Sequence, residues 1–253
     1  MKRAAFLLIL LYASLVPLRG QYRDSAAVRS RRNDKNYAES LRPVPLLISG
    51  ALFTVGALGV NWSFYNRNIN YPAKDCADRL MERYGPAKID DYLQYLPSAA
   101  FLSLGGLGRG GHNFGEHLAL GATAWGIMGL SVNALKYSYG DLRPDGSTYN
   151  SFPSGHTATA FMGAELVRIE YGGWWGVGAY TVAGVTALLR VYNGRHWVSD
   201  LFGGAAIGIL SANLAYLLLP FERRLFSVKE ASLSIVPFAS GTGGAGIALA
   251  CSF

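Results

Sequence analysis

Charged residues and cysteines are both scarce in this sequence. Aspartate, glutamate, lysine and arginine account for 15% of its 253 residues, well below the roughly 25% that is usual in soluble domains. The two cysteines, Cys76 and Cys251, are not accompanied by a Cys-x-x-Cys pair or a Cys/His cluster. The sequence therefore provides neither a zinc-binding motif nor a disulfide framework, and its low charge favours a membrane protein.

The charge that is present is mostly positive. The formal net charge is +7, in a chain of which 51% is hydrophobic. A basic chain is attracted to anionic lipid surfaces, and the preference for lysine and arginine in cytoplasmic loops accounts for most of such an excess. We therefore expect the lipid bilayer as a partner and no nucleic acid.

Apolar runs recur along the chain, and several approach the roughly 20 residues that a helix needs to cross a bilayer. The six runs are 46–64, 92–107, 118–135, 157–167, 174–189 and 201–219. The second run is short and contains Pro97, so it is the poorest candidate for a span. The pattern predicts an all-α fold, a transmembrane bundle of six helices.

The two ends of the chain differ from this apolar middle. Lys2 and Arg3 precede a short apolar stretch, so residues 1–20 are interpreted as a signal peptide or an uncleaved signal anchor. A basic polar tether (21–43), a membrane-embedded domain (44–225) and a tail (226–253) are expected to follow. Within the tail, alternation at 232–235, a glycine-rich turn at 241–244 and a further apolar stretch at 246–253 predict a β-hairpin.

Residues 190–200 place charge between two apolar runs. An ionisable side chain deep in a membrane costs roughly 2.5–3.5 kcal/mol on insertion scales, yet this stretch contains Arg190, Arg195, His196 and Asp200. His196 and Asp200 are four residues apart, which on a helix places them on one face. A carboxylate that accepts from one imidazole nitrogen leaves the other nitrogen free as a nucleophile. These residues alone fit an interfacial loop with an incidental pair equally well.

Two further stretches contain residues suited to phosphate chemistry. One runs from Lys136 to Arg143-Pro144, and the other, 152–156, reads Phe-Pro-Ser-Gly-His and ends at His156. Together with 190–200 they resemble the signatures of the type-2 phosphatidic acid phosphatase family, which is related to the vanadium haloperoxidases. The family pattern is Lys, six residues, Arg-Pro; Pro-Ser-Gly-His; and Ser-Arg, five residues, His, three residues, Asp. Only Leu189 departs from this pattern, because the family has serine at that position.

The resemblance implies a role for each matching residue. His196 would attack phosphorus to form a phosphohistidine, Asp200 would orient it, and His156 would protonate the leaving oxygen and then activate water. The phosphate would be bound by Lys136, Arg143, Ser154, Gly155 and Arg190. Positive side chains and the amides at a helix start suit the charge that a transferred phosphoryl group spreads over its oxygens. No metal and no cofactor is required for this chemistry.

The implied activity is hydrolysis of a phosphomonoester or diphosphate on a membrane lipid. The candidate substrates are lipid A, undecaprenyl diphosphate and phosphatidylglycerophosphate, and the sequence does not choose among them or give the oligomeric state. Two alternatives are a vanadate-dependent haloperoxidase-like enzyme and a non-catalytic lipid-binding or transport relative. The family further implies a multi-pass protein of the bacterial inner membrane, with its active site facing the periplasm. That orientation puts loops 108–114 and 168–173 inside, but it conflicts with cleavage of a signal peptide.

Other features give secondary expectations. Glu165, within an apolar run, should face the bundle interior. The glycines at 50, 56, 59, 203, 204 and 208 should let helices approach closely. Residues 77–84 should form a short amphipathic helix near the membrane surface. Arg195 is either a contact for a second phosphate or an ordinary exposed arginine.

Overall fold

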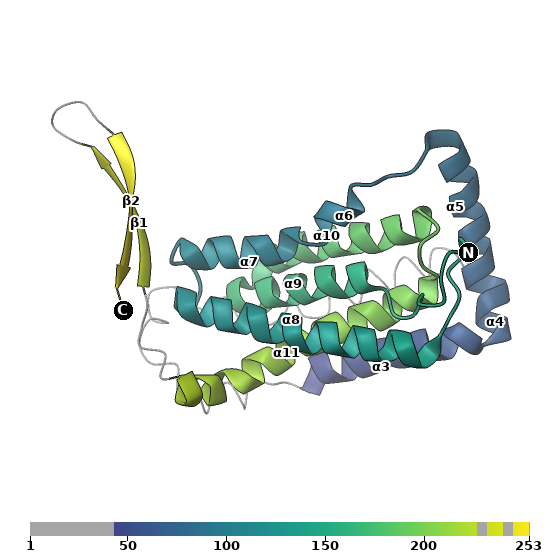
Figure 1. Ribbon diagram of the computed structural model, residues 1–253, viewed down its shortest axis with the longest axis horizontal. Helices are drawn as coiled ribbons and strands as arrows, with labels where there is room; N and C mark the ends of the chain where they lie inside the picture. The colour runs from purple at the N-terminus through teal and green to yellow at the C-terminus, as the bar shows by residue number, and fades with distance from the viewer. Residues whose placement is uncertain (1–42, 227–231, 240–244, 253) are drawn as a thin grey trace.

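The computed structural model describes residues 43–226, 232–239 and 245–252 (Figure 1). The signal segment predicted at 1–20, and all but the last residue of the tether predicted at 21–43, lie outside these ranges. Most helices run along the long axis of the molecule, and α5 stands across one end (Figure 1). The elements are α3 (Pro43–Asn61), α4 (Ser63–Tyr65), the π-helix η2 (Asn66–Asn70), α5 (Tyr71–Tyr84), α6 (Asp90–Leu93), α7 (Leu96–Gly106), α8 (Phe114–Tyr139), α9 (Gly155–Tyr171), α10 (Gly173–Tyr192), α11 (Val198–Phe226), β1 (Ser232–Ala239) and β2 (Ala245–Ser252).

The region that holds the predicted site is all-α, as expected. The apolar runs lie within or largely within α3, α7, α8, α9, α10 and α11. Among the described residues, three helices are long and apolar enough to cross a membrane, over Val44–Asn61, Phe114–Tyr139 and Val198–Arg223. Helix α7, which starts at a Pro-containing turn, has 11 residues and is too short to cross a hydrocarbon layer of roughly 30 Å. The chain is therefore a helical membrane protein, and six crossings stay a prediction.

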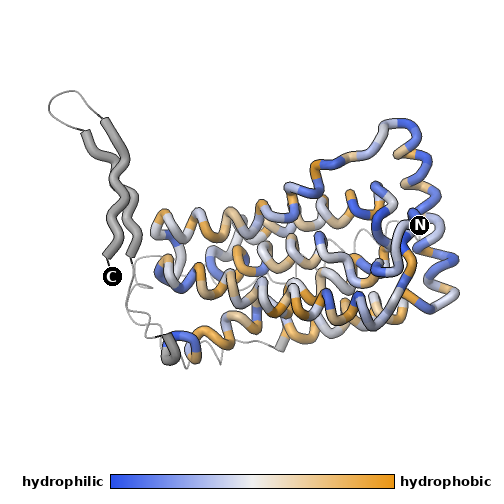
Figure 2. The backbone as a smooth tube through the Cα atoms, in the orientation of Figure 1, coloured by the Kyte–Doolittle hydropathy of each residue, from blue (hydrophilic) through white to orange (hydrophobic). Residues whose placement is uncertain are grey.

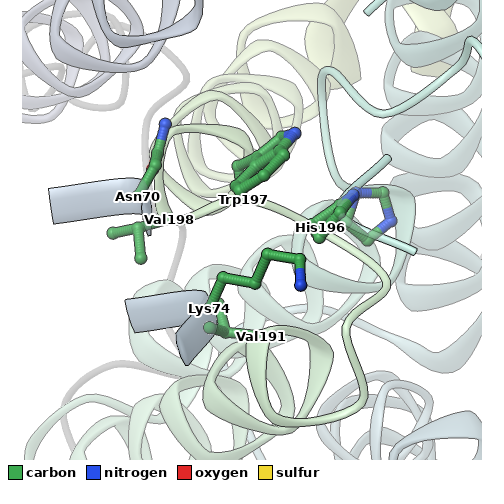
Figure 3. Close-up of a pocket in the computed structure, with 7 residues that line it drawn as sticks. Asn70, Lys74, Val191, His196, Trp197 and Val198 are labelled. Carbon is green, nitrogen blue, oxygen red and sulfur yellow. The ribbon is translucent and has the colours of Figure 1, made fainter. Parts of the chain in front are cut away.

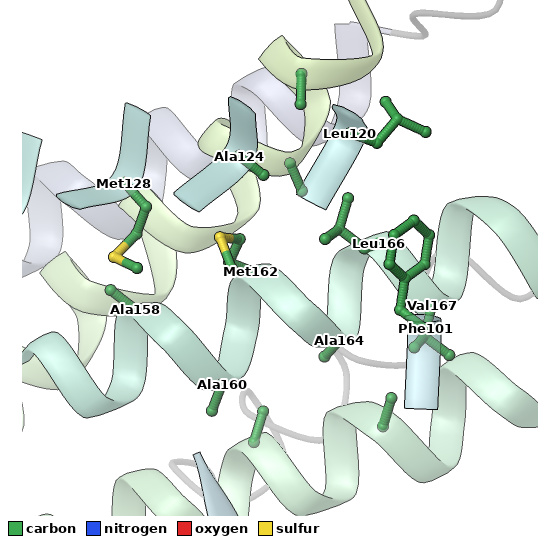
Figure 4. Close-up of a cluster of buried hydrophobic side chains, with 14 of the residues drawn as sticks. Phe101, Leu120, Ala124, Met128, Ala158, Ala160, Met162, Ala164, Leu166 and Val167 are labelled. Atoms are coloured by element: carbon green, nitrogen blue, oxygen red, sulfur yellow. The ribbon is translucent and has the colours of Figure 1, made fainter. Parts of the chain in front are cut away.

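Helix α9 forms the centre of the bundle. It contacts α7, α8, α10 and α11, and every residue from Thr157 to Val167 except Phe161 is buried. Met162 of α9 joins Met128 of α8 in one cluster of buried hydrophobic side chains (Figure 4). Because lipid tails are as apolar as these side chains, close packing rather than transfer from water holds such helices together. A central helix packed on all sides fixes the position of the residues at its ends.

Glycines bring α11 into direct contact with its neighbours. A Cβ atom on Gly204 would lie 2.5 Å from the carbonyl oxygen of Ser154, and one on Gly56 would lie 2.7 Å from the amide nitrogen of Gly203. Side chains would therefore separate α11 from α9 and from α3. The predicted close packing is confirmed at these positions and also at Gly59, Gly203 and Gly208. It is wrong for Gly50, around which a Cβ atom would meet no described atom within 4 Å.

The α8–α9 and α10–α11 connections bring four helix ends together. Helix α8 stops at Gly140, which adopts a left-handed φ of 58°, and α10 is followed by Gly194 with a φ of 64°. These conformations are accessible to glycine without strain. The C-terminal ends of α8 and α10 therefore meet the N-terminal ends of α9 and α11. Hydrophilic residues gather at this end of the bundle and along α5, whereas hydrophobic residues follow the long helices (Figure 2).

The predicted amphipathic helix is longer than expected. The sequence predicts a helix at 77–84, but α5 begins at Tyr71, directly after η2. Pro72 lies in the first turn of α5, at the point where the π-helical residues of η2 pass into the α-helix. Ala77 is buried against the bundle, while Leu80 and Tyr84 are exposed. Helix α5 thus presents apolar side chains outward beside the end where the four helix termini meet.

The C-terminal residues form two paired strands. Strands β1 and β2 are antiparallel, with Ser232 opposite Ser252 and Ala239 opposite Ala245. Both strands are eight residues long, so β1 extends beyond the alternating stretch 232–235. Strand β1 contacts α7 and α8.

Glu165 lies inside the bundle, as predicted, and only 1% of it is exposed. Its carboxylate accepts hydrogen bonds from Arg168 at 2.5 and 2.7 Å, from Tyr180 at 2.7 Å and from Asn213 at 2.8 Å. These partners come from α9, α10 and α11. A buried charge is tolerated only when it is paired and hydrogen-bonded, and Glu165 meets that condition.

Candidate active site

His196 and Asp200 form the buried centre of the site. Their side chains are 2% and 0% exposed, and Nδ1 of His196 lies 3.2 Å from Oδ2 of Asp200. The helical geometry predicted for this pair is wrong, because His196 precedes α11, which begins at Val198. Asp200 instead lies in the first turn of α11 and reaches back, where it also accepts the backbone N–H of Trp197 at 2.9 Å. With Nδ1 engaged, Nε2 of His196 is the nitrogen available for nucleophilic attack.

Ser151 is a site residue that the sequence reasoning missed. It is fully buried, and its hydroxyl donates to Oδ2 of Asp200 at 2.5 Å. The backbone strengthens the same junction, since the amide of Ser154 donates to the carbonyl oxygen of Asp200 at 3.1 Å. The loop before α9 is therefore bound to the start of α11. The only signal in the sequence was a serine directly before the 152–156 stretch.

The three predicted cations surround this pair. Lys136, near the end of α8, donates from Nζ to the carbonyl oxygen of Asn150 at 2.6 Å. The Nε atoms of Arg143 and Arg190 are buried and have no hydrogen-bond acceptor among the described residues. A buried donor without an acceptor costs roughly 1–3 kcal/mol, and more when it is charged. An anion that accepts from these two guanidinium groups would therefore be bound favourably.

The environment keeps His196 neutral. Burial holds the pKa of His196 well below its ordinary value of 6.5, and the positive charges of Lys136, Arg190 and Arg143 lower it further. Only the neutral imidazole has the free electron pair that a nucleophile needs. The same cations that suit a phosphate therefore also keep His196 in its reactive form.

Two adjacent carboxylates, Asp90 and Asp91, approach the site from α6. Nε2 of His156 lies 3.0 Å from Oδ1 of Asp91, and Nη1 of Arg190 donates to Oδ2 of Asp90 at 2.6 Å. The sequence analysis assigned no role to either carboxylate, so both contacts were missed. Asp90 and Asp91 are far from their partners along the chain, and nothing in their local pattern distinguishes them from solvated acidic residues.

Ser154 and Gly155 lie at the start of α9, as expected. The hydroxyl of Ser154 accepts from the amide of Thr157 at 3.4 Å and from the hydroxyl of Thr157 at 2.9 Å. The side chain of Ser154 is therefore used as the helix cap, and the first amides of α9 are the groups suited to an anion. A Cβ atom on Gly155 would meet only Val132, at 3.9 Å, which is an ordinary contact.

A shallow depression opens beside His196. It is lined by Asn70, Lys74, Pro144, Val191, His196, Trp197 and Val198 (Figure 3). Lys74 extends from α5 into this space (Figure 3), and its Nζ lies 2.5 Å from Asp78. Asn70 joins η2 to the start of α11 by donating to the hydroxyl of Ser199 at 3.2 Å. The η2–α5 segment therefore forms one wall next to the histidine.

The remaining charged residues of the site lie in the loop after α8 and next to His196. Arg195 is half exposed and pairs with Asp145 at 3.2 Å, an arrangement that fits an exposed ion pair. Asp141 is different, because burial, followed by the negative charge of Asp200, raises its pKa to about 6. Asp141 therefore gains a proton only slightly below neutral pH.

The chain is similar to known proteins through this same region. The profile of the PAP2 superfamily matches residues 117–224. Lipid A 1-phosphatase of Porphyromonas gingivalis is 49% identical over 134 residues, which cover 51% of this chain and 30% of that protein. The chain thus matches less than a third of that relative's length.

A solved structure also aligns with the chain. It is the crystal structure of the first transmembrane PAP2 type phosphatidylglycerolphosphate phosphatase from Bacillus subtilis, at 18% identity, covering 89% of this chain and 96% of that one with a TM-score of 0.37. The superfamily profile spans all three motif stretches, from Lys136 to Asp200, and ends within α11. Residues 117–224 of the chain therefore match the PAP2 superfamily.

Proposed function

We propose that this protein is an integral-membrane phosphatase that removes a phosphate group from a lipid through a phosphohistidine intermediate. The observation that carries the proposal is a buried His196 that is kept neutral, bonded to Asp200 through one nitrogen and surrounded by three cations. Positive charges gathered around a buried imidazole disfavour folding unless an anion completes the cluster. The match to the PAP2 superfamily supports this reading.

The first half of the reaction forms a P–N bond. Nε2 of His196 attacks phosphorus as the bond from phosphorus to the lipid oxygen breaks, and His156 gives its proton to that oxygen. Asp200 stabilises the positive charge that develops on the His196 ring. Fixed donors aimed at developing charge are usually the largest contribution to catalysis, and Arg143, Arg190 and the amides of α9 are suited to that task.

The second half releases inorganic phosphate. His156, now neutral, accepts a proton from a water molecule as the water oxygen attacks phosphorus, and the P–N bond to His196 breaks. His156 is then protonated again, and His196 returns to its neutral form. The acid of the first step therefore serves as the base of the second.

The proposed substrate is a phosphorylated lipid of the lipid A class. The support comes from the 49% identity to lipid A 1-phosphatase over about half of this chain. Undecaprenyl diphosphate and phosphatidylglycerophosphate stay as the competing substrates. All three present a phosphate on a membrane lipid, which suits a site at one end of a helical bundle.

A lipid panel tests the proposal. The full chain, purified in detergent, is incubated with each candidate lipid while inorganic phosphate is measured, with His196→Ala as the inactive control. We expect release of phosphate from a lipid A species above that from the other two. Release from none of them, or undiminished release by His196→Ala, would contradict the proposal. Oxidation of bromide by the vanadate-loaded protein with hydrogen peroxide as the oxidant would support the haloperoxidase-like alternative instead.

The proposed orientation places the active site on the periplasmic face of a bacterial inner membrane. The C-terminal ends of α7 and α9 lie at the opposite end of the bundle from His196. Arg109 follows α7, whereas Arg168 lies in the last turn of α9 and not in the loop predicted at 168–173. Arginine close to the end of a membrane span favours the cytoplasmic side. A reporter fused after Phe226 tests the orientation: cytoplasmic activity is expected, and periplasmic activity would reverse the assignment.

A further inference from the structure

We propose that Asp91 is a positioning residue for His156, which it holds in the tautomer and the charge state that proton transfer requires. The inference rests on the proposed phosphatase function, because it assigns Asp91 to the acid and base of that reaction. It adds to that function an acidic residue that lies outside residues 117–224, the part matched by the superfamily profile.

The contact between the two side chains is direct. Oδ1 of Asp91 lies 3.0 Å from Nε2 of His156, and the side chains are 59% and 27% exposed, respectively. The same oxygen is 3.7 Å from Nη1 of Arg190, which is beyond hydrogen-bonding distance. Arg190 uses that nitrogen for Asp90, at 2.6 Å. Asp90 thus bonds directly to the arginine, whereas Asp91 bonds directly to the histidine and forms only the longer ion pair with Arg190.

Asp91 is held in place by its own segment of chain. Between α5 and α6, the carbonyl oxygen of Gly85 accepts from the hydroxyl of Tyr192 at 2.5 Å. Asn193 binds both the amide and the carbonyl of Ala87, at 3.0 and 2.7 Å. The segment that leads into α6 is therefore fastened to the C-terminal end of α10, the helix that also presents Arg190. An exposed carboxylate on such a fixed segment has a defined direction.

The contact determines which imidazole nitrogen reacts. An ionised carboxylate only accepts hydrogen bonds, so Nε2 of His156 carries a hydrogen in this contact. The proton for the leaving oxygen then comes from Nδ1. After the transfer the ring is neutral, with its hydrogen on Nε2 and an electron pair on Nδ1. That nitrogen is the base for water in the second step, so one contact sets the tautomer for both halves of the reaction.

The charges around His156 define what Asp91 contributes. Asp90 and Asp91 face it from α6, Arg190 faces it from the end of α10, and His196 lies ahead of α11. Burial, followed by the positive charge of Arg190, lowers the pKa of His156, whereas the hydrogen bond to Asp91 and the charges of Asp91 and Asp90 act in the opposite direction. Asp91 therefore limits the loss of the acid form.

Asp91→Asn tests the inference, because it keeps the shape of the side chain and removes its charge. We expect kcat/KM for an alkyl phosphate lipid to fall roughly tenfold or more, short of the 10²–10⁴-fold range for loss of general acid–base catalysis. The basic limb of the pH profile should move to lower pH. For an aryl phosphate, which needs little protonation, the burst of phenol should be preserved. Asp75→Asn, at an exposed position of α5, is the matched control and should match the wild type.

A double-mutant cycle separates positioning from a general structural effect. If Asp91 acts through His156, Asp91→Asn should have no further effect in a His156→Ala background, whereas an independent structural effect should be additive. If the wild type is active and Asp91→Asn has the same kcat/KM as Asp75→Asn, the inference is overturned. Faster turnover by Asp91→Asn would also overturn it, because it would mean that the carboxylate competes with substrate. Wild-type protein that releases no phosphate from any lipid would instead contradict the proposed function.

Discussion

Ser151 and His196 contact the same oxygen atom, Oδ2 of Asp200, at 2.5 and 3.2 Å. Its other oxygen, Oδ1, is buried and has no hydrogen-bond partner among the described residues. The carboxylate is thus fixed by Ser151 on the side where it meets the histidine. The orientation of His196 depends on this serine through Asp200.

Ser151→Ala should therefore slow the enzyme although Ser151 is not a phosphate-binding residue. A hydrogen bond to a charged group contributes roughly 1.5–3 kcal/mol, which corresponds to a loss of about tenfold to a hundredfold in kcat. The measurement is phosphate release at saturating lipid. Ser138→Ala, which removes an exposed hydroxyl bonded to the Ala134 carbonyl, is the control and should be near wild type. Equal rates for the two variants would remove Ser151 from the support of Asp200.

The roles of the two histidines are separable by the leaving group. An aryl phosphate leaves as a stable phenolate, so His156→Ala should form the phosphoenzyme at nearly the normal rate and then stall at hydrolysis. Rapid-quench measurements should show a burst of phenol followed by a slow phase. His196→Ala should show no burst with any substrate. A burst that survives in His196→Ala and disappears in His156→Ala would exchange the two assignments.

The pH profile should report the cations around His196. Because the pKa of His196 is held well below 6.5, the His196 ring is still neutral and reactive at pH 6.5. Activity is lost only at lower pH, where the ring gains a proton. Arg143→Gln removes a positive charge and so favours the protonated ring. The acid limb of kcat/KM should therefore move to higher pH in this variant. The ionisation of the substrate is the same for both enzymes, so an unchanged limb would show that His196 does not set it.

Metal removal should leave the reaction unaffected, since Lys136, Arg143 and Arg190 provide the positive charge. We expect full phosphate release after treatment with a chelator, and inhibition by orthovanadate, which adopts the five-coordinate geometry of the transition state. Activity that disappears with chelator and returns with a divalent cation would contradict the proposed mechanism.

Gly208→Ala should destabilise the bundle. A Cβ atom there would lie 2.7 Å from the amide nitrogen of Met162, so α9 and α11 must separate, and overpacking of this kind costs roughly 1–3 kcal/mol. Gly126→Ala adds the same methyl group to α8 at a position with no described atom within 4 Å. Thermal unfolding in detergent should show a lower Tm for Gly208→Ala only. Equal Tm values would mean that the two helices are not packed through Gly208.

The apolar runs predicted the long helices because they leave a local signal. The three motif stretches indicated candidate site residues in the same way, and the roles of those residues stay predictions. Long apolar runs indicate the helices, and charge between such runs indicates a site. The structure brings Lys136, Arg143, His156, Arg190 and His196 to one end of the bundle, as the resemblance implied. The geometry of Asp200 was not predictable from spacing alone, since four residues fit a helix face as well as the helix-start contact that is present.

Ser151, Asp90 and Asp91 were missed for a different reason. Their importance comes from partners that are 49, 100 and 65 residues away, and such contacts depend on tertiary packing. A polar segment with balanced charge gives no indication of which carboxylate is directed inward. Their contacts with Arg190 and His156, which form only in the folded bundle, place these acids at the candidate site.

The hydrogen bonds of Glu165 bear on how the protein is built into its membrane. A lone carboxylate is costly to insert into lipid, but Arg168 on the same helix can enter with it as a pair, at 2.5 Å. Tyr180 and Asn213 reach the carboxylate only when α10 and α11 have arrived beside α9. The last contacts of Glu165 thus form only on correct assembly of three helices. A chain in which α10 or α11 inserts wrongly would leave this carboxylate incompletely bonded within the membrane, which is energetically costly.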